Sequence, residues 1–152
     1  MTRYEFLLTL HIAAAIVWLG AAVCVQLLAV RASRSRDPEQ MRKIADDAEW
    51  LATRLFVPAS ALVLVFGILL TFDAWAFDEL WILVGLAAFA LSFLVGIAFL
   101  SPESGRIARL IGEHGAAHSE VQARIRRLFV VSRIELVILF LVVVDMVAKP
   151  RF

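Results

Sequence analysis

The chain has 152 residues, of which 62% are apolar and 19% are charged. A soluble domain carries about 45–50% apolar residues, so this composition excludes an ordinary water-soluble globule and indicates a protein of the lipid bilayer. The 15 basic and 14 acidic residues give a net charge of +1, which offers no bulk attraction to nucleic acid. The single cysteine, Cys24, can form no intrachain disulfide.

Four apolar runs predict four membrane-spanning helices in a single domain over residues 1–152. Each run is close to the about 20 residues that cross a hydrocarbon core. Because the runs are continuous rather than alternating, they indicate helices and not the strands of a barrel. The predicted fold class is therefore all-α, an integral membrane four-helix bundle. Its spans are expected at about 4–30, 51–75, 80–100 and 128–148.

The two long connections are expected to hold short amphipathic helices at the membrane interface. Asp37, Pro38 and Gln40 are typical of an N-cap, a first-turn proline and a capping-box residue. Pro58 is expected to kink the second span or to mark where it enters the membrane. The other connection starts at Pro102, and its apolar stripe indicates an interfacial helix that runs into the fourth span. The stripe consists of Ile107, Leu110, Ile111, Val121, Ile125 and Leu128.

Basic residues predict the orientation of the chain. Eleven of the 15 lysines and arginines lie at 31–54 or 106–127, within the two long connections. By the positive-inside rule these connections are expected in the cytoplasm, with both termini outside. Trp75 and Trp81 flank the short outer turn, where indole rings favour the interface.

Five ionisable residues stand within or at the ends of the spans, where a charge is costly without a partner or a task. Arg133 and Glu135 are two residues apart, so they face different partners, and Arg133 is expected to snorkel to the interface. Glu135 is expected to be neutral or paired with a cation, which makes it a candidate for proton handling. Asp145 and Lys149 have the spacing of an ion pair at a helix end. The fifth is His11.

His11 shares one helix face with an indole and several methyl-sized side chains. The space beside the imidazole suits a flat cofactor such as a haem, whose iron takes a neutral histidine nitrogen. Alternatively, the alanines let a neighbouring helix approach, and the histidine hydrogen-bonds across the contact. The residues alone leave both interpretations open. The face consists of His11, Ala14, Ala15, Trp18, Ala21 and Ala22.

His114 and His118 are four residues apart, a spacing that lets two imidazoles share a metal. No cysteine or carboxylate on the same face completes such a site, so a histidine pair at the interface is favoured. The sequence has no nucleotide-binding glycine loop, nucleophile elbow or cysteine pair, which argues against hydrolase, kinase and Rossmann chemistry.

Three segments resemble a known family: "LHIAAAIVWLG", "LFVPASALVLVFGILL" and "VVVDMVAKP". They are similar to the HemJ family, small four-helix bacterial membrane proteins that oxidise protoporphyrinogen late in haem synthesis. They resemble even more an uncharacterised family of bacterial integral membrane proteins, a domain of unknown function, and more distantly the copper-resistance CopD domain. The resemblance to HemJ implies that His11 is associated with haem b, and it matches the terminal lysine–proline pair with Lys149 and Pro150.

The chain departs from the HemJ pattern in two places. HemJ proteins carry a second histidine after the first span, where this chain has "AAVCVQLLAVRA". Their fourth span opens with an Asn-Glu-x-Pro motif, where this chain has Ser132-Arg133-Ile134-Glu135. These changes argue against protoporphyrinogen oxidation but not against a haem on His11. The second axial ligand is left open, with Met146 as one candidate.

The predicted function is that of a membrane protein that binds haem b, with His11 as axial ligand, for haem handling or electron transfer. One alternative is a HemJ-like protoporphyrinogen oxidase. Another is a non-enzymatic scaffold or assembly subunit whose small-residue face packs on another helix. The expected partners are the lipid bilayer and a second copy or another membrane subunit, but no nucleic acid. The candidate cofactor-binding residues are His11, Trp18, Arg133, Glu135 and Lys149.

Overall fold

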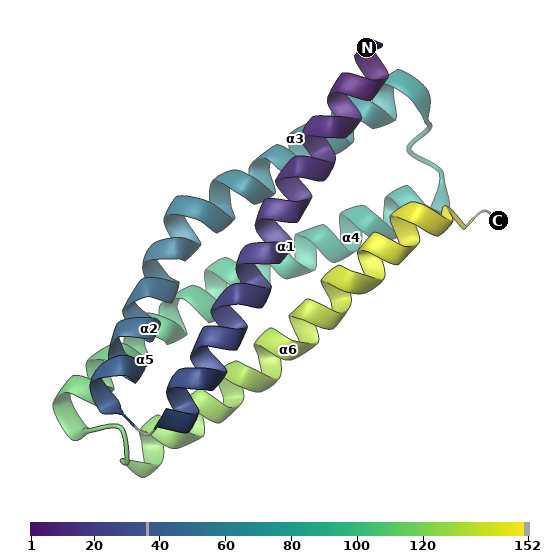
Figure 1. Ribbon diagram of the computed structural model, residues 1–152. Coiled ribbons are helices and arrows are strands. Elements are labelled where there is room, and N and C mark those ends of the chain that lie inside the picture. Colours follow the sequence, from purple (N-terminus) through teal and green to yellow (C-terminus); the bar gives the residue numbers. More distant parts are fainter. Residues whose placement is uncertain (36, 151–152) are drawn as a thin grey trace.

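The computed structural model describes residues 1–35 and 37–150. Four long helical rods lie side by side, and both chain ends are at the same end of the molecule, the termini end (Figure 1). The first rod is α1 (Arg3–Ser35) and the fourth is α6 (Ser119–Ala148). The second consists of α2 (Pro38–Leu51), the π-helical turn η1 (Ala52–Phe56) and α3 (Val57–Ala74). The third consists of α4 (Leu80–Val95), the π-helical turn η2 (Gly96–Leu100) and α5 (Ser101–His114).

The four rods, with no strand among the described residues, agree with the all-α prediction. The first three rods are long and apolar enough to cross a membrane. α6 is long enough but carries Arg133, Glu135 and Asp145 within its apolar part, and it is not among them. The run predicted as a fourth span at 128–148 is therefore helical, and its place across the membrane stays a prediction.

The N-terminus of α2 is capped as the sequence predicts. The Asp37 carboxylate accepts hydrogen bonds from the backbone N–H groups of Glu39 (3.0 Å) and Gln40 (3.4 Å), and Pro38 lies in the first turn. The capping-box contact expected of the Gln40 side chain is not formed. Instead, the Asp37 N–H donates to Ser35 Oγ at 3.3 Å, which satisfies the group that the amide would have reached.

The two composite rods each contain a π-helical turn that ends two residues before a proline. η1 precedes Pro58 and η2 precedes Pro102. A proline has no N–H, and its ring crowds the carbonyl four residues earlier, so the preceding turn widens. The disturbance predicted at Pro58 takes this form. At Pro102 the sequence predicted the start of a separate segment, whereas the helix continues through it.

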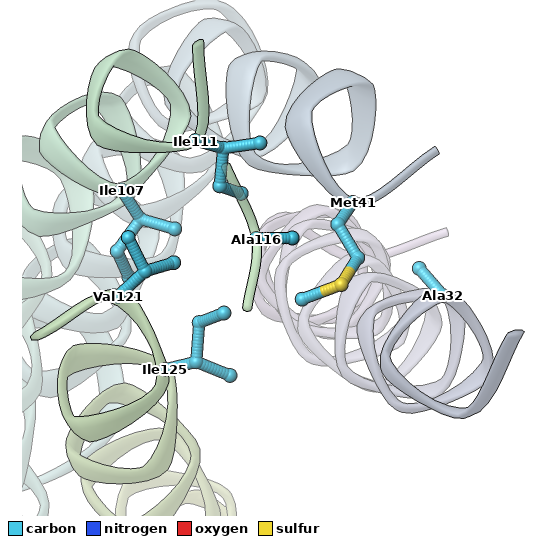
Figure 2. Close-up of a cluster of buried hydrophobic side chains, with 7 residues drawn as sticks. All are labelled: Ala32, Met41, Ile107, Ile111, Ala116, Val121 and Ile125. Carbon is cyan, nitrogen blue, oxygen red and sulfur yellow. The ribbon is translucent and has the colours of Figure 1, made fainter. Parts of the chain in front are cut away.

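The apolar stripe of the third connection is covered by protein. Gly115, with φ +81°, turns the chain and divides the stripe between α5 and the start of α6. α5 packs on α2, and the apolar side chains of these segments point toward one another (Figure 2). An interfacial position for these helices therefore stays a prediction. The cluster consists of Ala32, Met41, Ile107, Ile111, Ala116, Val121 and Ile125.

This cluster lies at the end of the bundle opposite the termini, called here the basic end. Most of the basic residues used for orientation are at this end, but Arg36 and Arg151 lie outside the described residues. The described basic residues here are Arg31, Arg34, Arg42, Lys43, Arg106, Arg109, Arg124, Arg126 and Arg127, whereas Arg54 lies farther along the second rod, in η1.

A carboxylate ties α5 to α6 at the basic end. Glu103 is 7% exposed, and its Oε1 accepts a hydrogen bond from Arg124 Nη1 at 2.9 Å. Arg106 lies 3.5 Å from the other carboxylate oxygen, and Arg124 also pairs with Glu120 at 3.0 Å. The hydrogen bonds that the Arg124 guanidinium donates to Glu103 and Glu120 raise its pKa above the ordinary value. The ion pairs therefore hold the guanidinium between two helical segments.

The cap of α2 predicts a measurable loss of stability on substitution. Asp37→Ala removes the acceptor for two backbone N–H groups and is expected to lower the free energy of unfolding by about 1 kcal/mol. Unfolding in mixed detergent micelles measures the change. Asp47→Ala, near the other end of α2, is the control and should change stability by less than about 0.5 kcal/mol. Equal effects of the two substitutions would contradict the cap.

The buried carboxylate predicts a larger effect. Glu103→Ala leaves Arg124 without its α5 partner and is expected to lower the free energy of unfolding by about 1–3 kcal/mol. Glu120→Ala removes an exposed partner within α6 and should have a much smaller effect. Thermal unfolding followed by circular dichroism compares the two. The structure would be contradicted if Glu120→Ala were the more destabilising change.

Candidate functional site

A cavity of about 320 Å³ lies between the four rods, in the half of the bundle toward the basic end. Toward the termini end it is closed by Trp18, Ala59 and Leu139, which cluster with Phe89. Toward the basic end it is closed by the cluster shown in Figure 2. Its size falls at the lower end of the about 300–1,000 Å³ typical of ligand pockets. The cavity is thus a gap between two apolar cores.

Both π-helical turns form walls of the cavity. Such turns are rare and are often found at functional sites, because they displace backbone and side chains from regular helical positions. Here they lie on two different rods and contribute to the same space. The lining residues that they supply are Ala52, Thr53 and Phe56 from η1 and Gly96, Ile97 and Leu100 from η2.

Besides Ser101, three polar side chains of the described lining lack a hydrogen-bond partner for at least one group. Ser92 is 2% exposed, and its hydroxyl makes no hydrogen bond. Gln26 accepts a hydrogen bond from Ser132 at 2.7 Å through Oε1, but its Nε2 is buried without a partner. Glu135 makes no hydrogen bond or ion pair with any described residue. Other lining hydroxyls donate to carbonyls of their own helices, namely those of Ser33, Thr53, Ser60 and Ser104.

The structure does not bring the five candidate cofactor residues together. Trp18 and Glu135 line the cavity. His11 lies on α1 nearer the termini end and is not part of the lining. Arg133 is exposed on α6, and Lys149 follows the last residue of that helix. Of the five candidates, Trp18 and Glu135 therefore belong to the described cavity lining.

His11 lies in the contact between α1 and α3. Its Nδ1 is 2.9 Å from the carbonyl oxygen of Val63, so the ring donates a hydrogen bond across the helix contact. A side chain at Gly67 would crowd it, because a Cβ there would lie 3.1 Å from His11 Cε1. Ala14 and Trp18 on the same face of α1 are buried, so this face is used within the chain. This arrangement is the packing alternative that the sequence left open.

The same hydrogen bond also determines that the other ring nitrogen of His11, Nε2, is unprotonated in the neutral imidazole. With the proton on Nδ1, His11 Nε2 carries a lone pair, and no hydrogen bond to it is found among the described residues. Metal-bound histidines are commonly oriented in this way, by an N–H donated to a carbonyl. The geometry therefore fits an interhelical contact and does not remove the ligand interpretation.

The ion pair expected between Asp145 and Lys149 is not formed. Lys149 ends α6 in the left-handed conformation, with φ 46°, and its N–H donates to the Asp145 carbonyl at 2.8 Å. Its ammonium lies 4.2 Å from the ring centre of Trp75 and 5.4 Å from that of Trp81. Because the chain leaves the helix at this residue, the side chain does not follow the helical face and stacks on the indoles instead.

Two weaker candidates stay apart from the cavity. The side chain of Met146, a candidate second ligand, packs against Gly85 of α4. The rings of His114 and His118 lie 5.1 Å apart at an exposed turn. No group of three metal-binding side chains that includes them is found in the described part of the chain.

The contact at Gly67 predicts the effect of added volume. Gly67→Leu forces the side chain into His11 and is expected to break the Val63 hydrogen bond, with a loss of about 1–3 kcal/mol in stability. Gly20→Leu is the matched control, since nothing lies within 4 Å of a Cβ at that position. Thermal unfolding in detergent compares the variants. A Gly67→Leu protein as stable as Gly20→Leu would contradict the contact.

Comparison with known proteins places the chain in a family. No curated protein and no solved structure matches it. The family model described as "Predicted integral membrane protein (DUF2269)" matches residues 5–150. This is a domain of unknown function, as the resemblance of the spans to such a family led us to expect, and the match does not extend to HemJ. Because it covers nearly the whole length and agrees with the long apolar helices, the chain belongs to the DUF2269 family of predicted integral membrane proteins.

Proposed function

We propose that the protein binds a membrane-soluble organic ligand in the cavity between its four rods. One observation carries the proposal: an apolar cavity contains the unpartnered hydroxyl of Ser92 and the unpartnered amide nitrogen of Gln26. Each such group costs about 1–3 kcal/mol when it is buried without a hydrogen bond. A ligand with a polar group among apolar substituents satisfies these side chains and fills the space.

The charge distribution supports one orientation of this site. If the basic end is in the cytoplasm, as the positive-inside rule predicts, the proposed site is in the cytoplasmic half of the membrane, which the family resemblance makes a bacterial cytoplasmic membrane. A ligand dissolved in the bilayer then reaches the site without crossing the membrane.

Gly96 permits a direct test of the cavity. It belongs to the lining, and nothing lies within 4 Å of a Cβ there, so Gly96→Leu enters empty space and is expected to displace the ligand without a clash. Gly20→Leu is the control, because that glycine is equally open but does not line the cavity. Each protein is purified into lipid nanodiscs, and the organic extract is analysed by mass spectrometry.

We expect a compound that is retained by the wild type and by Gly20→Leu and is depleted roughly tenfold in Gly96→Leu, the ratio that a loss of about 1.4 kcal/mol in affinity produces. A compound present equally in all three, or no compound beyond the bulk lipids, would sink the proposal.

A haem b on His11 is the second candidate, and the orientation of the imidazole by Val63 is compatible with it. A bound haem would supply one-electron chemistry for haem handling, electron transfer or a HemJ-like oxidation. The cavity itself does not fit such a haem. His11 is absent from the lining, and the described lining has no basic side chain for a propionate. A haem on His11 therefore requires a different site beside α1.

The absorption spectrum of the purified protein tests this candidate. After expression with sufficient haem, we expect a Soret band that is lost in His11→Ala and kept in His118→Ala. No band, or a band unaffected by His11→Ala, would exclude His11 as the ligand.

A further inference from the structure

We infer that the cavity takes a lipophilic organic cation, with Glu135 as its counter-ion. The inference rests on the proposed function, because it concerns the ligand of the same cavity. Among the described residues that line the cavity, Glu135 is the sole ionisable one. No lysine, arginine or histidine of the described lining faces it. The ionisable group that the described lining offers to a ligand is therefore an acidic one.

Glu135 is half-buried, which makes a neutralising partner for its carboxylate important. A carboxylate that is partly withdrawn from water into an apolar cavity is disfavoured unless a cation or a proton neutralises it. Arg133, the nearest basic residue along α6, is exposed and forms no ion pair with Glu135. An anionic ligand such as a fatty acid or a phospholipid headgroup would find no cation among the described lining residues and would be repelled by the Glu135 carboxylate. A cationic ligand would instead be attracted by the Glu135 carboxylate.

The helical register places Glu135 near the level of the polar side chains of Ser132 and Ser92 in the cavity. It is one turn from Leu139, which belongs to the cluster that closes the termini side, and nearly one turn from Ser132, which bonds Gln26. Ser92 is likewise three residues after Phe89, whose ring centre lies 5.5 Å from that of Trp18. The carboxyl of Glu135 and the unpartnered hydroxyl therefore lie at similar depth, next to the aromatic closure.

The walls favour an organic cation over an inorganic one. Four aromatic side chains line the cavity, and ring faces attract cations most strongly where water is excluded. A metal ion would require several oxygen ligands, and no group of three metal-binding side chains that includes Glu135 is found in the described chain. The ligand class is thus an ammonium with apolar substituents. The aromatic residues are Trp18, Phe56, Phe93 and Phe129.

Two probes of the same shape test the inference. Benzyltrimethylammonium carries the positive charge, and neopentylbenzene has carbon in place of the nitrogen. Calorimetric titration into nanodiscs, with empty nanodiscs subtracted, measures both dissociation constants. We expect the wild type to bind the cation at least roughly tenfold more tightly than the neutral probe. Glu135→Gln should remove this preference and retain binding of the neutral probe.

Two variants control for folding and for charge. Glu135→Asp keeps a carboxylate and should keep a preference for the cation even if Glu135→Gln is poorly folded. Asp145→Asn removes a carboxylate of the same helix outside the lining and should leave the preference unchanged.

Equal affinities of the wild type for the two probes, or a preference that survives Glu135→Gln in a folded protein, overturn the inference but leave the proposed cavity function standing. Absence of binding of both probes to the wild type also overturns it, and the extracts of Gly96→Leu then decide the proposed function separately. Binding of both probes that is unchanged in Gly96→Leu shows instead that the cavity is not the site.

Discussion

The lipid surroundings of the apolar runs impose the condition on which the rest of the structure depends, because lipid offers no hydrogen bonds to the chain. Backbone groups must therefore be paired within helices, and side-chain polar groups must find partners inside the protein. Most hydroxyls near the cavity meet this condition by bonding to carbonyls of their own helices, as Ser60 and Ser104 do. Ser92 does not. In lipid, a polar group without a hydrogen-bond partner is more informative than the same group on a water-exposed surface.

The prolines and the cavity are connected through the π-helical turns. Pro58 and Pro102 lie on different rods, and each follows a widened turn that faces the same space. The two apolar clusters hold the rods together on either side of this region, so the bundle is closed at both ends of the cavity. The cavity therefore lies between two packed apolar clusters.

Much of the fold could be predicted from the sequence. The apolar runs indicated the helices, and Asp37 and Pro38 indicated where α2 begins, since capping is a local interaction. The stripe from Ile107 to Leu128 was recognised as apolar, but its partner was not. A stripe looks the same whether it faces lipid or another helix, and α2 covers it here. Sequence spacing likewise did not predict the partner of Lys149, because the backbone conformation of this residue turns its side chain away from Asp145.

The site was predicted less completely. Among polar residues within the spans, sequence reasoning singled out ionisable ones and missed Gln26 and Ser92, although uncharged polar residues in apolar runs were a readable signal. Glu135 was recognised by its charge, yet the sequence does not show that no basic side chain of the described lining lies beside it. Its surroundings come from four rods whose contributions are far apart along the chain.

The sequence by itself determined the lipid environment, the helical class and the few polar residues that require an explanation, because composition, periodicity and capping are properties of neighbouring residues. The tertiary structure decided which of those residues share a space. It placed His11 against α3 and Glu135 in the cavity, because side-chain surroundings depend on how the rods pack and not on the order of residues within any one of them.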